Sequence, residues 1–296
     1  MILRAAILVV AALLTWSGPA LAVPFFFSTG NPDGKIATAS RPSSAGKVEI
    51  ESADDFAVAG GTLSLTSATF QGLIPTGASL STITSVGVEI YRVFPLDSNV
   101  ARTSGAPTFS TSQVPTRVNS PSDVELVSRD SGSGGGLTFT PGIVQSSFTA
   151  ANSVLNGIHP MPNQTTGGDL AVTGQQVQFN VLFTSPISLP DGHYFFVPQV
   201  ELSSGDFFWL SAPRPIVPPG TPFTAGVTDL QSWIRNEGLD PDWLRVGTDI
   251  VGVGTFNAAF SLGGDLSEVP EPATMLLWGT TMVAMGAVRR RRLRRD

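Results

Sequence analysis

Carboxylate side chains are the residues best suited to chemistry in this 296-residue sequence. Asp54 and Asp55 are adjacent where a strand is predicted to begin, and Asp240-Pro241-Asp242 places two acids in a predicted turn. A glycosidase needs two carboxyl groups about 5–10 Å apart in a cleft. Because adjacent strand residues point to opposite faces, Asp54 and Asp55 are not expected to act as such a pair.

Structural roles are the main alternative for these acids. Asp54, Asp55 and Asp242 could cap turns, or they could bind Ca²⁺ through oxygen ligands. No D-x-D-x-D loop occurs in the sequence, which favours turn capping over calcium and leaves the three acids as weak calcium candidates. We therefore expect no metal ion and no cofactor.

The two histidines, His159 and His193, are the only residues on which a histidine-dependent mechanism could rest. The sequence contains no G-x-S-x-G elbow, no H-E-x-x-H pair and no phosphate-binding loop. A serine triad assembled only in space stays possible. No catalytic residue is predicted, and we expect a protein that is not an enzyme.

Aromatic residues give the one hint of ligand binding. Trp209, Trp233 and Trp243 could form a platform on which sugar rings stack, and Trp243 follows an Asp-Pro-Asp turn, which predicts exposure. The alternative is that they fill the core, where aromatic residues in strands usually lie.

The elements that must position these side chains are mostly strands. Val177, Phe179, Val181 and Phe183 are apolar at every second position, as in a half-buried strand. Several further short strands, separated by Gly-, Pro- and Ser-rich turns, predict an all-β fold: an antiparallel β-sandwich, with a jelly roll as one possible connectivity. The best helix candidate is Asp229–Asn236, where Leu230, Trp233 and Ile234 follow helical spacing.

Both ends of the chain differ in character from this body. Residues 1–22 combine Arg4, an apolar run and the exit Ala20-Leu21-Ala22, which predicts a signal peptide cleaved by signal peptidase after Ala22. Near the other end, the uncharged residues 273–288 predict a short membrane helix. An arginine cluster on the cytoplasmic side follows it, made of Arg289, Arg290, Arg291, Arg292, Arg294 and Arg295.

Charge and cysteine content narrow the functional classes. Without that cluster, Arg4 and Asp296, the chain keeps 10 basic and 22 acidic residues, so its charge is near −12 rather than −6. A body this acidic argues against nucleic acid as a partner. The absence of cysteine excludes disulfides and thiolate sites.

The C-terminal segment resembles the PEP-CTERM sorting signal. The resemblance rests on Val269-Pro270-Glu271-Pro272-Ala273-Thr274, the apolar segment and the terminal arginines, in that order. It implies a Gram-negative exporter, transient attachment to the inner membrane, and recognition of Pro270, Glu271 and Pro272 by an exosortase-type membrane protease. It also implies association with exopolysaccharide or biofilm production.

The body is similar, over short stretches, to secreted bacterial β-sandwich proteins of unassigned function. The stretches are Ala53–Phe56, Leu189–Tyr194, Trp243 and Asn257–Gly264. The expected organisation is therefore a signal peptide (1–22), a β-sandwich (23–264), a linker with the PEP motif (265–272), a membrane helix (273–288) and the arginine cluster (289–296).

Three functions stay open for the body. It is expected to be a non-catalytic structural or adhesive protein of the cell surface or matrix. A carbohydrate-binding module for exopolysaccharide is the alternative, and a secreted polysaccharide hydrolase is a third.

Overall fold

The computed structural model describes residues 22–268, apart from 106–108, 112–113, 133 and 159–163. The chain divides into two units. One is the compact body Pro24–Leu266, and the other combines Met1–Val23 with Ser267–Asp296. Only four residues of the second unit are described. The predicted signal peptide, membrane helix and arginine cluster therefore lie outside the described residues, apart from Ala22.

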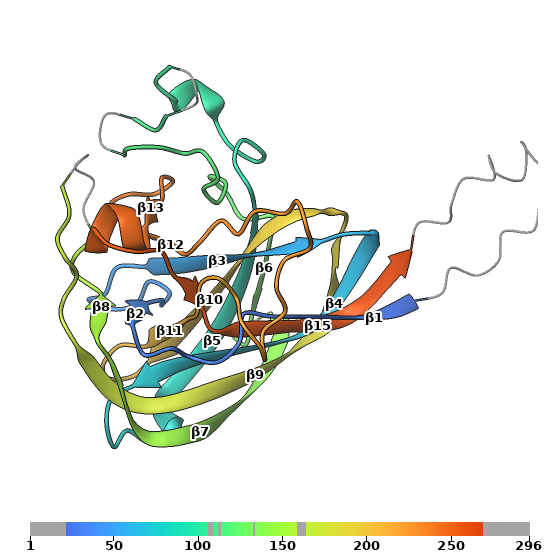
Figure 1. Ribbon diagram of the computed structural model, residues 1–296. Helices are drawn as coiled ribbons and strands as arrows, with labels where there is room; N and C mark the ends of the chain where they lie inside the picture. The colour runs from blue at the N-terminus through green and yellow to red at the C-terminus, as the bar shows by residue number, and fades with distance from the viewer. Residues whose placement is uncertain (1–21, 106–108, 112–113, 133, 159–163, 269–296) are drawn as a thin grey trace, which may run out of the picture. The chain divides into compact units, whose positions relative to one another are not determined.

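The larger of two sheets in the body has nine strands (Figure 1). All of its printed pairings are antiparallel, except that β2 and β8 run parallel. Its strands are β1 (Ala22–Ser28), β2 (Ile36–Ala39), β4 (Gly61–Ile74), β7 (Leu137–Ala150), β8 (Asn152–Val154), β9 (Val172–Leu189), β11 (Phe208–Ala212), β14 (Asn257–Ala258) and β15 (Phe260–Glu268).

The smaller sheet has six strands in the order β13-β12-β3-β10-β5-β6, and its printed pairings are all antiparallel. Its strands are β3 (Ile50–Val58), β5 (Ile83–Arg92), β6 (Val127–Asp130), β10 (Gly192–Leu202), β12 (Trp233–Asn236) and β13 (Leu244–Arg245).

The two sheets pack face to face over one apolar core. The alternating residues of β9 point into it, and Val177 and Phe179 are fully buried. From the smaller sheet, the Phe196 ring stacks on Phe260 at 5.1 Å and meets Trp209 edge-on at 6.0 Å. This arrangement confirms the predicted all-β sandwich. The jelly-roll connectivity stays a prediction.

The helix predicted at Asp229–Asn236 is wrong. Its second half is β12, in which Trp233 pairs with Ala53 of β3. Gln231 has φ of +64°, which an α-helix does not allow. Pairing with a distant strand therefore overrides the local spacing. A single-turn π-helix lies instead at Val246–Val251, and 3-10 turns lie at Leu80–Thr82 and Val100–Arg102.

The C-terminal strand is longer than the sequence suggests. β15 continues to Glu268 and includes the first four residues of the predicted linker. β1 begins and β15 ends at the same end of the nine-stranded sheet (Figure 1). No helix among the described residues is long and apolar enough to cross a membrane.

Candidate functional site

A hollow of about 780 Å³ lies over the outer face of the six-stranded sheet. Its walls are the segment between β5 and β6 and the turn after β12. Eight carboxylate residues and two arginines line it, and we call it the acidic hollow.

Strand alternation brings the acidic residues to this face. Phe56 of β3 points into the sandwich core, so residues at odd positions, such as Glu51, point outward. Register then aligns the neighbouring strands: Arg235 of β12 lies opposite Glu51, and Glu89 of β5 lies opposite Val197 of β10. Arg235 and Glu51 are therefore direct cross-strand neighbours. The register of β3 and β10 continues to place Val197 opposite Ala53, so Glu89 lies on the same outward face but one row along from Glu51.

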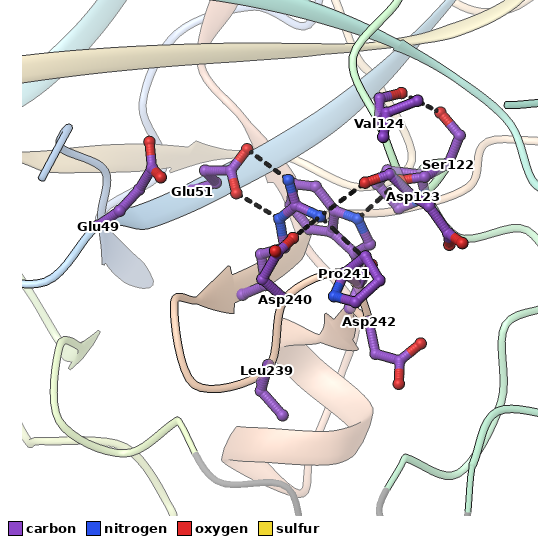
Figure 2. A network of polar contacts seen from close by, with 12 residues as sticks. Glu49, Glu51, Ser122, Asp123, Val124, Leu239, Asp240, Pro241 and Asp242 are labelled. Carbon is purple, nitrogen blue, oxygen red and sulfur yellow. Dashed lines mark hydrogen bonds and ion pairs between the residues drawn. The ribbon is translucent and has the colours of Figure 1, made fainter. Parts of the chain in front are cut away.

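Arg235 is the centre of the floor. Its guanidinium forms a two-pronged pair with Glu51, with Nη2 3.1 Å from Oε1, and its Nη1 lies 2.8 Å from Asp240 Oδ1 (Figure 2). Nη1 also donates to the carbonyls of Asp123 and Pro241, at 3.2 and 3.3 Å. The guanidinium carbon lies 4.4 Å from the ring centre of Trp243. Arg235 is thus held on every side.

The charge on Arg235 is stabilised despite its burial. Burial by itself lowers the pKa of Arg235, but Glu51, Tyr91 and Asp240 together outweigh that effect and raise the pKa overall. Both side chains are 6% exposed. The pair is therefore a buried ion pair, in which either partner left alone would be an uncompensated charge.

Tyr91 joins Glu51 to Glu89. Its hydroxyl lies 2.7 Å from Glu51 Oε1 and 2.8 Å from Glu89 Oε2, and it accepts a hydrogen bond from Arg235 Nη2 at 3.0 Å. A phenol has one proton to donate, so two ionised carboxylates cannot both be satisfied by it. Burial and the charge of Glu51 raise the pKa of Glu89 to about 8, which keeps Glu89 protonated at neutral pH.

The same conditions act on the neighbouring groups. Burial and the charge of Glu51 raise the pKa of Tyr91. Burial also raises the pKa of Glu49, although the amide of Gln199, which donates to Glu49 Oε1 at 2.8 Å, opposes the effect.

A second network of charges supports one wall. Arg102 Nη2 lies 2.9 Å from Asp242 Oδ1 and 3.3 Å from Asp123 Oδ1, and Arg117 also pairs with Asp123. The Asp242 carboxylate is therefore engaged by arginines, which corrects the expectation that this carboxylate caps a turn. Its backbone amide closes the turn by donating to the carbonyl of Leu239.

Asp54 and Asp55 lie in the middle of β3, so the prediction that they cap a turn where the strand begins is also wrong. As expected, they occupy opposite faces. Asp54 accepts hydrogen bonds from the Ala258 amide and the Ser232 hydroxyl, whereas Asp55 Oδ2 lies 2.6 Å from His193 Nε2. Burial raises the pKa of both acids. Among the described residues, no group of three histidine, cysteine or acidic side chains is placed to hold a metal ion.

The tryptophan platform is contradicted by burial. Trp209, Trp233 and Trp243 are 1%, 1% and 2% exposed, so none presents an indole face to a sugar. Each indole N–H donates to a backbone carbonyl, of Ala259, Leu230 and Ser122 respectively. Trp243 is covered because the segment between β5 and β6 folds over the turn that was expected to expose it.

The remaining predicted residues belong to the two ends. His159, Ala20, the motif Pro270-Glu271-Pro272 and all six clustered arginines lie outside the described residues, while Ala22 begins β1.

The acidic hollow itself was missed from the sequence. A partial signal existed, because Glu49 and Glu51 alternate with Val48 and Ile50. Arg235, in contrast, stood inside the segment predicted as a helix.

Comparison with known proteins identifies the tail. The family model for the PEP-CTERM protein-sorting motif matches residues 268–292. No curated protein and no solved structure matches the chain. The resemblance seen at the C-terminus is confirmed: the chain carries a PEP-CTERM signal, which indicates an exported protein of the cell surface or exterior that an exosortase sorts. The looser resemblance of the body stays a prediction.

Proposed function

We propose that the body is a non-catalytic adhesive or structural protein of the cell surface or extracellular matrix, and that the acidic hollow is its contact site for exopolysaccharide. The proposal rests on one observation: the rigid floor around Arg235 lies beneath carboxylates that no described lysine or arginine pairs with. Glu125 and Glu237 are exposed carboxylates of this kind on the wall of the hollow.

Carboxylates of this kind suit a hydroxyl-rich ligand. An ionised carboxylate offers about four acceptor positions and can bind two neighbouring sugar hydroxyls. A floor already held by ion pairs and carbonyl contacts loses little side-chain freedom when a ligand binds. These two features together favour binding of a polysaccharide.

Hydrolysis fits the geometry less well. Two catalytic carboxyl groups must flank the glycosidic bond. Two carboxyl groups in the hollow, those of Glu51 and Glu89, have the Tyr91 hydroxyl between them, at 2.7 and 2.8 Å. No glycosidic oxygen fits between them while Tyr91 occupies that place, which supports a binding role.

We propose further that the tail holds the chain in the inner membrane of a Gram-negative cell until an exosortase acts at Pro270-Glu271-Pro272. The support is the sorting motif matched at residues 268–292, which includes the apolar segment and the first four of the clustered arginines.

Binding is tested with the purified body, residues 23–268, and the exopolysaccharide of the producing strain. Wild-type body should co-sediment with the polysaccharide. A smaller fraction of the variant Glu125→Gln/Glu237→Gln should co-sediment. Glu201→Gln, a change on β10 outside the hollow, should bind like wild type. Equal retention of all three proteins would show that the hollow is not the contact site.

Catalysis is tested separately on the same polysaccharide. The proposal expects no release of new reducing ends on prolonged incubation. If wild-type body releases new reducing ends and Glu89→Gln does not, the role of the hollow is hydrolysis rather than binding.

A further inference from the structure

β7 is a long strand at an open edge of the nine-stranded sheet. It pairs with β9 along one side, and no other described strand pairs with it (Figure 1). A Cβ added at Gly142, near its middle, would have no heavy atom within 4 Å, so the face of the strand is also uncovered at that residue. Within the described part of the chain, the backbone edge of β7 is therefore open to a partner.

The chemistry of this edge is unusual for so acidic a protein. β7, its neighbour β9 and the next strand β4 contain no Asp, Glu, Lys or Arg at all. The exposed residues of the edge include Ile143 at 53% and Val144 at 49%. Proteins usually protect an open edge with charges, bulges or short length. β7 has bulges and one proline, Pro141, but no charge, and it is 14 residues long.

The other sheet edges are protected in these ways. β6 has four residues and carries Arg129 and Asp130, while β13 has two residues and β8 has three. The end of β1 is covered, because the amide of Thr221 donates to the carbonyl of Ser28. Among the described residues, β7 is thus the longest uncharged edge. β1 is also uncharged, but it has seven residues and includes Pro24.

We propose that β7 pairs antiparallel with β7 of a second copy of this chain, which joins two nine-stranded sheets into one. Two copies of one strand that pair across a two-fold axis form a self-complementary interface, because every contact from the first copy to the second is repeated from the second to the first. The partner is a second copy because two acidic bodies repel each other except where their surfaces carry no charge, and β4, β9 and β7 form such a surface.

Assembly stops at two copies. An open filament needs a head-to-tail interface, in which one surface of a copy binds a different surface of the next copy. Pairing of β7 with β7 occupies the same edge in both copies, so this contact closes as a dimer. This inference goes beyond the proposed function, and it does not depend on what the acidic hollow binds.

Oligomeric state is the first test, made on the body, residues 23–268, which includes both sheets and all the core clusters. Wild type should sediment as a dimer. Val144→Lys/Ser146→Lys places like charges on both copies of the edge and should sediment at half that mass. Ser185→Lys/Ser188→Lys, on the part of β9 beyond its pairing with β7, should stay dimeric.

Charge complementation makes this test specific. Val144→Lys/Ser146→Lys and Val144→Glu/Ser146→Glu should each be monomeric alone and form a one-to-one dimer when mixed. A monomeric wild type, or a dimer that survives the lysine changes, would overturn the proposal, since the edge would then be unused or covered by something else.

The absence of cysteine allows an independent measurement. Single substitutions to cysteine at each position from Ile143 to Ser147 should give a disulfide-linked dimer, strongest at the position nearest the two-fold axis. Cysteine at Ser188 should not cross-link. Equal or no cross-linking along the whole series would contradict antiparallel pairing at β7.

Discussion

Arg235 shows how one residue can organise the acidic hollow. It contacts side chains or carbonyls from β3, β5 and two separate loops, and its guanidinium packs over Trp243. Removing such a residue removes more than a surface charge, because Glu51 has only 6% of its side chain exposed and cannot turn to water.

We predict that Arg235→Met lowers the free energy of unfolding by about 3–5 kcal/mol, because Glu51 is left as a buried unpaired charge. Urea unfolding measures the change. Glu51→Gln/Arg235→Met should recover much of the loss, since it removes both charges. A double variant as unstable as the single one would show that packing against Trp243, rather than the ion pair, dominates.

Glu89 gives the hollow a dependence on pH. Its pKa is raised from 4.5 to about 8 in the folded protein, so the folded state binds a proton that the unfolded state releases. The stability linked to that proton is fully present below about pH 4.5 and is lost as the pH rises through about 8. Asp54, Asp55 and Glu49, whose pKa values are also raised, act in the same direction.

We therefore predict that the free energy of unfolding falls from about pH 5 to about pH 9, and that Glu89→Gln shows a smaller fall because its amide cannot ionise. Unfolding in urea across this pH range makes the measurement. Glu201→Gln serves as the control and should follow wild type. If the free energy of unfolding of Glu89→Gln falls with pH as steeply as that of wild type, Glu89 does not hold a proton at neutral pH in the folded state.

At the scale of elements, close strand packing depends on Gly72 in β4. A Cβ at this position would lie 2.2 Å from the Phe207 ring and 2.5 Å from the carbonyl oxygen of Phe208. Phe207 is 1% exposed and packs edge-on against Phe70 at 5.9 Å, so it has little room to move.

We predict that Gly72→Ala destabilises the body by about 1–3 kcal/mol through this overlap. Thermal unfolding followed by circular dichroism measures it. Gly87→Ala on β5 is the matched control, since the nearest atom to its new Cβ would be 3.8 Å away. Similar losses in both variants would indicate a general effect of replacing strand glycines.

The sequence was informative where the signal was local. Alternation at Val177, Phe179 and Val181 predicted β9 and the sandwich, and that prediction is confirmed. The sequence was not informative where segments distant along the chain meet in the fold. Trp233 and Ile234 had helical spacing with Leu230, yet their segment pairs with β3, and Trp243 is buried by a segment more than a hundred residues earlier.

The acidic hollow could not be predicted for the same reason. Its central pair joins Glu51 to Arg235, which are separated by 184 positions and meet only through the register of β3 and β12. The alternating positions of Glu49 and Glu51 indicate only that their side chains lie on the same face of one strand. They contain no information on which strand lies beside it or what covers both.

At the scale of the whole molecule, the charge is divided between an acidic body and a basic tail. Six arginines in the last eight positions follow the sorting motif, while the body keeps most of the acidic residues. β1 begins and β15 ends at one end of the sheet (Figure 1). The described chain therefore begins and ends at the same end of the nine-stranded sheet, and the acidic hollow belongs to the other sheet.

The matched sorting motif predicts processing near Pro270-Glu271-Pro272. We predict that Glu271→Ala prevents processing, because the matched motif loses the acidic residue between its two prolines. The full chain should then stay in the membrane fraction, while wild type is recovered outside the cell at a lower mass. Immunoblots of membrane and external fractions measure both forms. Asp265→Ala, an exposed acid within β15, is the control and should be processed like wild type. If Glu271→Ala is also cut and exported normally, the motif does not direct processing at this position, and the anchored intermediate proposed for this chain would be wrong.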